Sequence, residues 1–144
     1  MSDAAEPTVI PYILVKNAAR AIDFYKSVFG AEECGARFTD PSGRIGHAEL
    51  QIGNSKIMLA DEHPPAHVFA PMLFFLRVPD ADAAVQKAVA AGATLSRPIA
   101  NEAYGERSGV VQDPFGHSWM ISAHVEDLTK RELQQRVAGE YEIS

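Results

Sequence analysis

The sequence repeats one order of elements twice, and this repeat constrains the fold more than any other feature. The first copy begins with an apolar, strand-like run at 9–15 and continues with a helical pattern between Asn17 and Gly30. Three further strand-like runs follow at 34–38, 45–52 and 55–60. The second copy holds a strand at 72–78, a helix between Asp80 and Gly92, and strands at 94–99, 108–112 and 117–123. Val15 corresponds to Val78, 63 positions later (78 − 15), and Ile22 corresponds to Val85 at the same offset. The repeat predicts an α+β fold of two tandem βαβββ modules.

The signals between these runs predict how the chain is organised. Residues 1–8 are polar and predict a disordered N-terminus, and residues 9–123 predict a single domain. Within that domain we expect module one at 9–61, a linker or lid with three prolines at 61–71, and module two at 72–123. Residues 124–144 predict a C-terminal helical extension, because Thr129 and Glu132 have the spacing of a capping box.

Charge and composition exclude several classes of partner. The chain has 13 Lys and Arg against 19 Asp and Glu, a net charge of −6, and no basic cluster, which argues against nucleic acid as a partner. No apolar run approaches the roughly 20 residues needed to cross a bilayer, and residues 1–8 lack the features of a signal peptide. Because Cys34 is the single cysteine, no disulfide can form within the chain. We therefore expect a cytoplasmic protein without a nucleic-acid or membrane partner.

Three segments carry a resemblance to a known superfamily. They are the run Ala21-Ile22-Asp23-Phe24-Tyr25 followed by Phe29-Gly30, the stretch AVAAGAT that ends at Thr94, and Asp113-Pro114-Phe115-Gly116-His117. Over residues 9–123 the chain resembles the vicinal oxygen chelate superfamily, which includes glyoxalase I, bleomycin-resistance proteins and extradiol dioxygenases. The segments His47-Ala48-Glu49-Leu50, Tyr104-Gly105-Glu106-Arg107 and DPFGHSW are similar to its PhnB-like branch. The resemblance implies two modules that form a partial barrel around a cavity, and a homodimer.

Strand alternation predicts which side chains would line such a cavity. Ala48, Leu50 and Ile52 should pack under the helices, so that His47, Glu49 and Gln51 share the opposite face. If the sheet curls as in the family, this face lines a pocket; in an ordinary half-exposed sheet it would be solvated. Further candidate ligand-binding residues are Tyr12, Phe75, Tyr104, Arg107 and Met120. Arg107 could bind a carboxylate or phosphate, or form a surface salt bridge.

The metal positions that the resemblance implies hold no usual ligands. Metal-using relatives carry one His or Glu on the first and last strand of each module, and the matching positions here are Ile10 or Tyr12, Ile57 or Met58, Leu73, and Met120. We therefore predict no metal and no other cofactor. A divalent ion could bind only through an unusual set, such as His47 and Glu49 with His63, His67 or a residue of a partner chain.

Three functions remain open at this stage. The first is a protein that binds a small organic ligand in a metal-independent cavity, with a resistance or sequestration role. The second is a lyase or isomerase that uses His47 and Glu49 for proton transfer, or an atypical divalent metal site. The third is a dimeric scaffold with a vestigial pocket. No sequence feature identifies a substrate.

Overall fold

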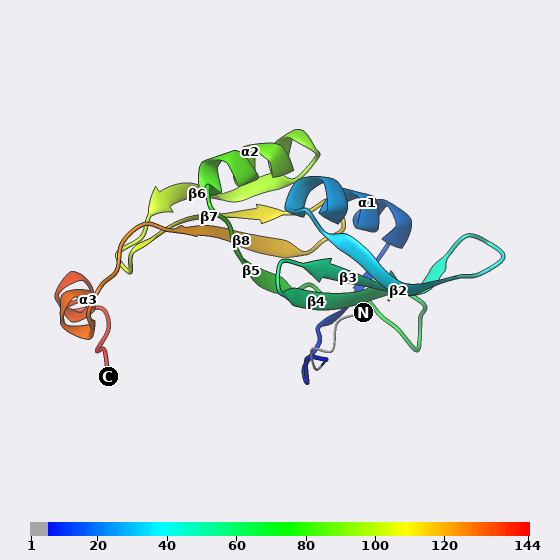
Figure 1. Ribbon diagram of the computed structural model, residues 1–144, viewed down its shortest axis with the longest axis horizontal. Helices are drawn as coiled ribbons and strands as arrows, with labels where there is room; N and C mark the ends of the chain where they lie inside the picture. The colour runs from blue at the N-terminus through cyan, green and yellow to red at the C-terminus, as the bar shows by residue number, and fades with distance from the viewer. Residues whose placement is uncertain (1–5) are drawn as a thin grey trace. The chain divides into compact units, whose positions relative to one another are not determined.

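The computed structural model describes residues 6–144, so the first five residues of the predicted disordered N-terminus lie outside the described part. The chain divides into two compact units, Met1–Met72 and Leu73–Ser144. Figure 1 follows the chain through both units, from blue at the N-terminus to red at the C-terminus. No helix in the described residues is long and apolar enough to cross a membrane.

The first unit is one four-stranded sheet with one helix. Its elements are β1 (Tyr12–Val15), α1 (Ala18–Phe29), β2 (Glu32–Thr39), β3 (Ile45–Ile52) and β4 (Ser55–Asp61). The strand order is β1-β4-β3-β2, with β1 parallel to β4 and the other pairs antiparallel. The Asn17 side chain caps α1 by accepting from the Arg20 amide at 3.2 Å, and Gly30 ends it with a φ of 69°.

The core of this unit lies between α1 and one face of its sheet. Ala48 and Leu50 of β3 are fully buried, as the alternation predicted, whereas Ile52 at the end of the strand is only half-buried. They pack with Ile22 and Tyr25 of α1, which are also fully buried. Because successive side chains of a strand alternate, the polar residues of β3 lie on the opposite, open face.

The second unit repeats this topology, which confirms the duplication. Its elements are β5 (Leu73–Arg77), α2 (Ala81–Ala90), β6 (Thr94–Asn101), β7 (Glu106–Gln112), β8 (Ser118–His124) and α3 (Lys130–Arg136). The strand order β5-β8-β7-β6 and the parallel pairing of β5 with β8 are those of the first unit. Each unit is thus an open four-stranded sheet, and the α+β fold of two βαβββ modules is confirmed. The capping box of α3 is also present, between Thr129 and Glu132.

For β1 and β7, backbone hydrogen bonding explains why the first residue of the strand differs from the prediction. The run at 9–15 forms a strand only from Tyr12, because Pro11 has no N–H for the ladder and contributes only its carbonyl, which accepts from Met58 N at 2.9 Å. β7 begins at Glu106, two residues earlier than predicted, because Glu106 and Arg107 already pair with His124 and Ala123 of β8. The candidate ligand-binding residue Arg107 is therefore held in a strand.

Candidate functional site

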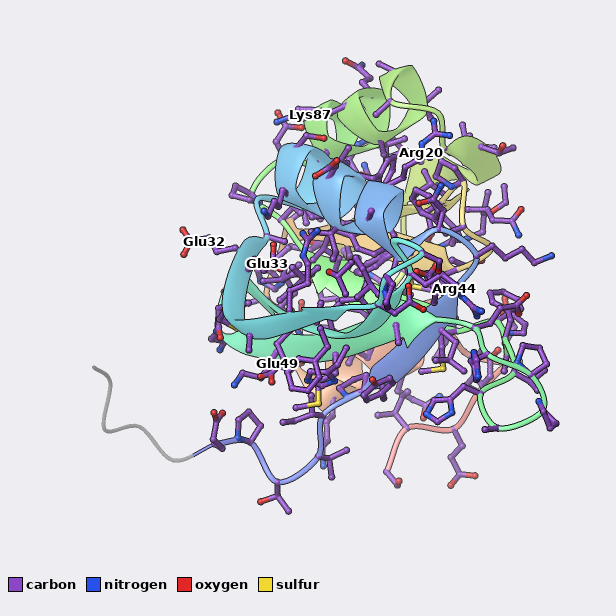
Figure 2. All side chains as sticks on the ribbon, turned by 90° about the vertical axis from the view of Figure 1, so that its right-hand side faces the viewer. Arg20, Glu32, Glu33, Arg44, Glu49 and Lys87 are labelled. Atoms are coloured by element: carbon purple, nitrogen blue, oxygen red, sulfur yellow. The ribbon has the colours of Figure 1, made fainter. Side chains whose placement is uncertain are left out.

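Four polar side chains form a connected row on the open face of the first sheet, and we call them the polar wall: Tyr12, His47, Glu49 and Lys56. The Tyr12 hydroxyl lies 3.0 Å from Nδ1 of His47, and Nε2 of His47 lies 3.0 Å from Oε2 of Glu49. The Lys56 ammonium lies 3.4 Å from Oε1 of Glu49. Figure 2 shows Glu49 on the side of the sheet opposite α1, whereas Glu33 lies on the helix side.

Strand register brings these residues together from three strands. Tyr12 of the parallel edge strand β1 pairs with Met58 of β4, and Met58 pairs in turn with Glu49 of β3. Phe38 of β2 pairs with His47, and its ring meets the imidazole edge to face at 5.8 Å. The imidazole therefore has an aromatic neighbour on each side, since the Tyr12 ring lies 5.6 Å away.

The wall is partly shielded from solvent, and Lys56 is shared between Glu49 and Glu6, at 3.4 and 2.8 Å. The side chains of His47, Glu49 and Lys56 are 24%, 21% and 12% exposed. The hydrogen bond from His47, more than the nearby Lys56, lowers the pKa of Glu49, so that this carboxylate stays ionised. Burial, and secondarily the charge of Glu49, raises the pKa of the Tyr12 phenol, which therefore keeps its proton at neutral pH.

With a neutral imidazole, the hydrogen bonds of the row can all run in one direction. A protonated phenol can donate to Nδ1 of His47, while Nε2–H of the same ring donates to the Glu49 carboxylate. With its hydrogen used in this way, the Tyr12 oxygen presents lone pairs to the open face. The arrangement can accept a hydrogen bond from a ligand, and it can also pass a proton along the row.

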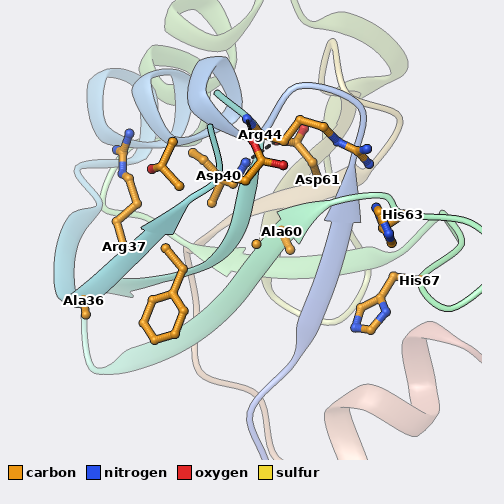
Figure 3. Close-up of a pocket in the computed structure, with 12 residues that line it drawn as sticks. Ala36, Arg37, Asp40, Arg44, Ala60, Asp61, His63 and His67 are labelled. Atoms are coloured by element: carbon orange, nitrogen blue, oxygen red, sulfur yellow. Dashed lines mark hydrogen bonds between the residues drawn. The ribbon is translucent and has the colours of Figure 1, made fainter. Parts of the chain in front are cut away.

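A cavity of about 660 Å³ lies in the first unit beside the polar wall (Figure 3). Phe38, which contacts His47, lines this cavity, and so does Gly46, whose carbonyl oxygen lies 3.4 Å from the Tyr12 hydroxyl oxygen. Its Asp61 carboxylate is already satisfied, because it accepts from the amides of Ala18 at 2.9 Å and Ile45 at 2.8 Å. Asp61 therefore holds the start of α1 against the sheet and is not a free ligand for a metal.

Two other predicted ligand-binding residues have partners within the protein. The Gln51 amide donates to the carbonyl of Gly53 in the β3–β4 hairpin at 3.0 Å, and it does not join the polar wall. Arg107 forms a two-pronged ion pair with Asp82 of α2, at 2.8 and 3.0 Å. Of the two alternatives for Arg107, the salt bridge is thus the one present, and we do not build the site on these two residues.

The remaining candidates lie in the second unit. Phe75 and Tyr104 line a cavity of about 510 Å³ there, and Met120 of β8 is the cross-strand partner of Phe75. This pairing repeats that of Tyr12 with Met58 in the first unit. Each open face thus carries an aromatic side chain beside a methionine.

The second cavity also holds a charged cluster that the sequence analysis did not identify. Oε1 of Glu106 accepts from Ser122 at 2.9 Å, and Oε2 lies 2.8 Å from Nδ1 of His124. Nε2 of His124 lies 2.8 Å from Asp127. The bonds from Glu106 and then Asp127 raise the pKa of His124, and the bond from His124 is the main cause of the lowered pKa of Glu106. The sequence contained one signal of this cluster. Arg77 is the single charged residue of the apolar run MLFFLRV, and it lines the same cavity.

The donor sets of these faces do not fit the metal site that the resemblance implies. Across residues 6–144, no group of three or more His, Cys, Asp or Glu side chains could hold a metal ion. The implied positions, which are Ile10 or Tyr12, Ile57 or Met58, Leu73 and Met120, carry alkyl, phenol and thioether groups. These are not the imidazole and carboxylate donors that catalytic divalent ions require. We therefore derive no step through a metal.

Comparison with known proteins places this geometry in a family context. The family model described as the Glyoxalase/Bleomycin resistance protein/Dioxygenase superfamily matches residues 7–121. An uncharacterized protein of Mycobacterium bovis is 36% identical over 150 residues, which cover 97% of this chain and 98% of that protein. The crystal structure of TioX from Micromonospora sp. ML1 is 25% identical, with a TM-score of 0.64 and coverage of 85% of this chain and all of that one. A PhnB protein from Bacillus cereus shares the fold, with a TM-score of 0.63 at 17% identity over 81% of this chain and 99% of its own.

Proposed function

The chain belongs to the glyoxalase/bleomycin resistance protein/dioxygenase superfamily, and on that premise we propose that it binds a small organic ligand on the polar wall without a resident metal. The observation that carries the proposal is the hydrogen-bonded row from Tyr12 through His47 to Glu49 on an open sheet face. In the polar wall, side chains from three strands orient one another, and contact with solvent alone does not require such an arrangement. Such orientation is typical of a preformed site.

The composition of the wall favours an uncharged ligand with an apolar or aromatic body. Lys56 pairs with Glu6 at 2.8 Å and with Glu49 at 3.4 Å, so the row offers no uncompensated positive charge to an anion. Phe38 and Tyr12 are 62% and 42% exposed and provide aromatic surface beside the polar row. The Tyr12 oxygen accepts a hydrogen bond, which suits a ligand with a hydroxyl or amide donor. A binder of this kind would act by sequestration, as in resistance to a toxic compound.

Proton transfer is the second candidate function, and the continuity of the same row favours it. A substrate O–H, or a C–H next to a carbonyl, would give its proton to the Tyr12 oxygen while the phenolic proton moves to Nδ1 of His47. Glu49 would stabilise the resulting imidazolium, and the substrate would retain the electron pair as an alkoxide or enolate. Return of the proton to another carbon would complete an isomerisation. If instead the enolate expels a leaving group from the neighbouring carbon and that group takes the proton, the result is an elimination.

Binding to a set of aromatic alcohols and amides tests the first function. We expect ligand-observed NMR in EDTA to find members of this set that bind, and Tyr12→Phe to weaken them about tenfold, because one hydrogen bond is lost. Tyr141→Phe is the matched control, since Tyr141 is 69% exposed near the C-terminus. Equal binding to Tyr12→Phe and the wild type, or binding that requires an added divalent ion, would contradict the proposal.

Isotope exchange separates the two functions. If the wall transfers protons, the wild type will catalyse exchange of a C–H beside a carbonyl in bound fragments dissolved in D₂O. His47→Asn and Glu49→Gln should then abolish exchange even where binding persists. Binding without exchange in the wild type would leave sequestration as the function of the wall.

A further inference from the structure

We propose that the cavity of the second unit is a separate binding site for an aromatic or apolar compound with a carboxylate, and that Arg77 binds the carboxylate. The site comprises Phe75, Arg77, Tyr104, and the side chains of α3 and the segment before it that complete the lining. It shares no residue with the polar wall, so the proposal does not rest on the function proposed above.

The guanidinium of Arg77 is not committed to any hydrogen bond found in the described residues. It forms a loose ion pair with Glu106, in which Nη1 lies 3.9 Å from Oε1 and so beyond hydrogen-bond distance, and its side chain is 78% exposed. Arg107 in the same unit instead makes two short bonds to Asp82. Arg77 therefore retains the planar set of donors that binds a carboxylate through two parallel hydrogen bonds.

The carboxylates around the cavity accept hydrogen bonds from side chains other than Arg77. Glu106 is satisfied by Ser122 and His124, and Asp127 is satisfied by His124. Glu126 forms an ion pair with Arg136 of α3. Glu106 and Asp127 share His124, so each carboxylate at the cavity has a hydrogen-bond partner other than Arg77. The N–H groups of Arg77 therefore remain available to a ligand.

Aromatic surface next to Arg77 indicates what else the ligand carries. The guanidinium lies over the ring of Phe75 at 5.3 Å, which holds its plane while its N–H edges stay free. Phe75 is 49% exposed and Tyr104 is 46% exposed, and both line the cavity with Leu128 and Leu133. A volume of about 510 Å³ is within the range of small-molecule sites.

The rim of the cavity selects a carboxylate over a phosphate. Asp127 is fully exposed there, and Glu126 lies next to it in the chain. These negative charges would repel a dianion more strongly than a monoanion, even though the guanidinium fork matches both groups.

Three probes with one ring system test the site on the full chain: 2-naphthoate, the neutral 2-naphthamide and 2-naphthyl phosphate. We expect calorimetry to show that 2-naphthoate binds about tenfold more tightly than either of the others, and that Arg77→Met removes this preference. Arg77→Lys should retain only part of it, because an ammonium lacks the planar fork. Arg20→Ala, at an exposed arginine of α1, is the control that should change nothing.

The outcomes separate this proposal from the function of the polar wall. Tyr12→Phe should leave 2-naphthoate binding unchanged, and Arg77→Met should leave the neutral aromatic alcohols unaffected. Equal affinity for 2-naphthoate and 2-naphthamide, no detectable binding of 2-naphthoate, or unchanged selectivity in Arg77→Met would overturn the proposal. Tighter binding of the phosphate would overturn the preference for a carboxylate. Because Arg77 is largely exposed, its substitution should not impair folding.

Discussion

At the scale of single residues, two aspartates begin turns of the same Asp-Pro-x-Gly type but differ in burial. Asp113 is 3% exposed, and its carboxylate accepts from the amides of Phe115 and His117 and from the Trp119 indole at 2.9, 3.0 and 2.9 Å. Asp40 is exposed and accepts from Ser42 and from the Arg44 amide. The buried carboxylate therefore joins turn and core, whereas the exposed one only shapes a surface turn.

This difference predicts unequal costs of substitution. Asp113→Ala leaves three donors without that acceptor, and we expect it to destabilise the protein by about 3 kcal/mol, or roughly 10 °C in Tm. Asp40→Ala should cost much less, because water can replace its bonds. Thermal melting of both variants checks this, and equal losses would show that the burial of Asp113 is not the reason.

The Glu106–His124 pair makes a pH-dependent contribution with a defined sign. His124 has a raised pKa, so its contribution is full below its unfolded value of 6.5 and is lost as pH rises through the folded pKa. Glu106 has a lowered pKa, so its contribution is present above 4.5 and is lost as pH falls through the folded pKa. The difference in Tm between wild type and His124→Asn should therefore be largest between those two values. A difference independent of pH across the neutral range would show that the pair is not ionised as inferred.

At the scale of elements, Gly105 determines how the segment that leads to α3 docks on β7. The Gly105 carbonyl accepts from the amides of Val125 and Glu126 at 2.9 and 3.2 Å. Its φ is +89°, and a Cβ added there would lie 2.5 Å from the carbonyl oxygen of Glu126. This close approach, together with the ion pair between Glu126 and Arg136, connects α3 to the second unit.

We therefore expect Gly105→Ala to release the segment from Val125 to Arg136. Gly43→Ala is a matched control, because Gly43 has a φ of +91° and no atom within 4 Å of an added Cβ. Both variants should lose about 1 kcal/mol from backbone strain, but only Gly105→Ala should speed hydrogen exchange in α3. Unchanged exchange there would contradict the docking role of Gly105.

Single elements also show why the sequence predicted the fold more completely than it predicted the candidate site. Alternation and capping residues determine strand faces and helix ends locally, and β3 was therefore predicted with its observed bounds, Ile45–Ile52. The row from His47 to Glu49 follows from the same alternation. The cluster around His124 joins β7, β8 and the segment before α3, and it depends on the register that opposes Glu106 to His124. Periodicity within one strand contains no information on that register.

At the scale of the whole molecule, duplication has produced two similar sheets with different open faces. The first face carries a hydrogen-bonded row from Tyr12 to Glu49, and the second carries Arg77 over the ring of Phe75. The homodimer that the resemblance implies stays a prediction. Sedimentation equilibrium should show a mass twice that of one chain, and a single-chain mass would contradict it.

NMR of the His47 imidazole resonances can show whether the polar wall binds an organic ligand without a metal. In protein without a histidine tag and in the presence of EDTA, adding a bound aromatic alcohol should shift the His47 ring signals, because Nδ1 contacts the Tyr12 hydroxyl that meets the ligand. The signals of His117, which is fully buried in the second unit, should stay in place. Unmoved His47 signals at saturation, or a shift that appears only after a divalent ion is added, would contradict the account.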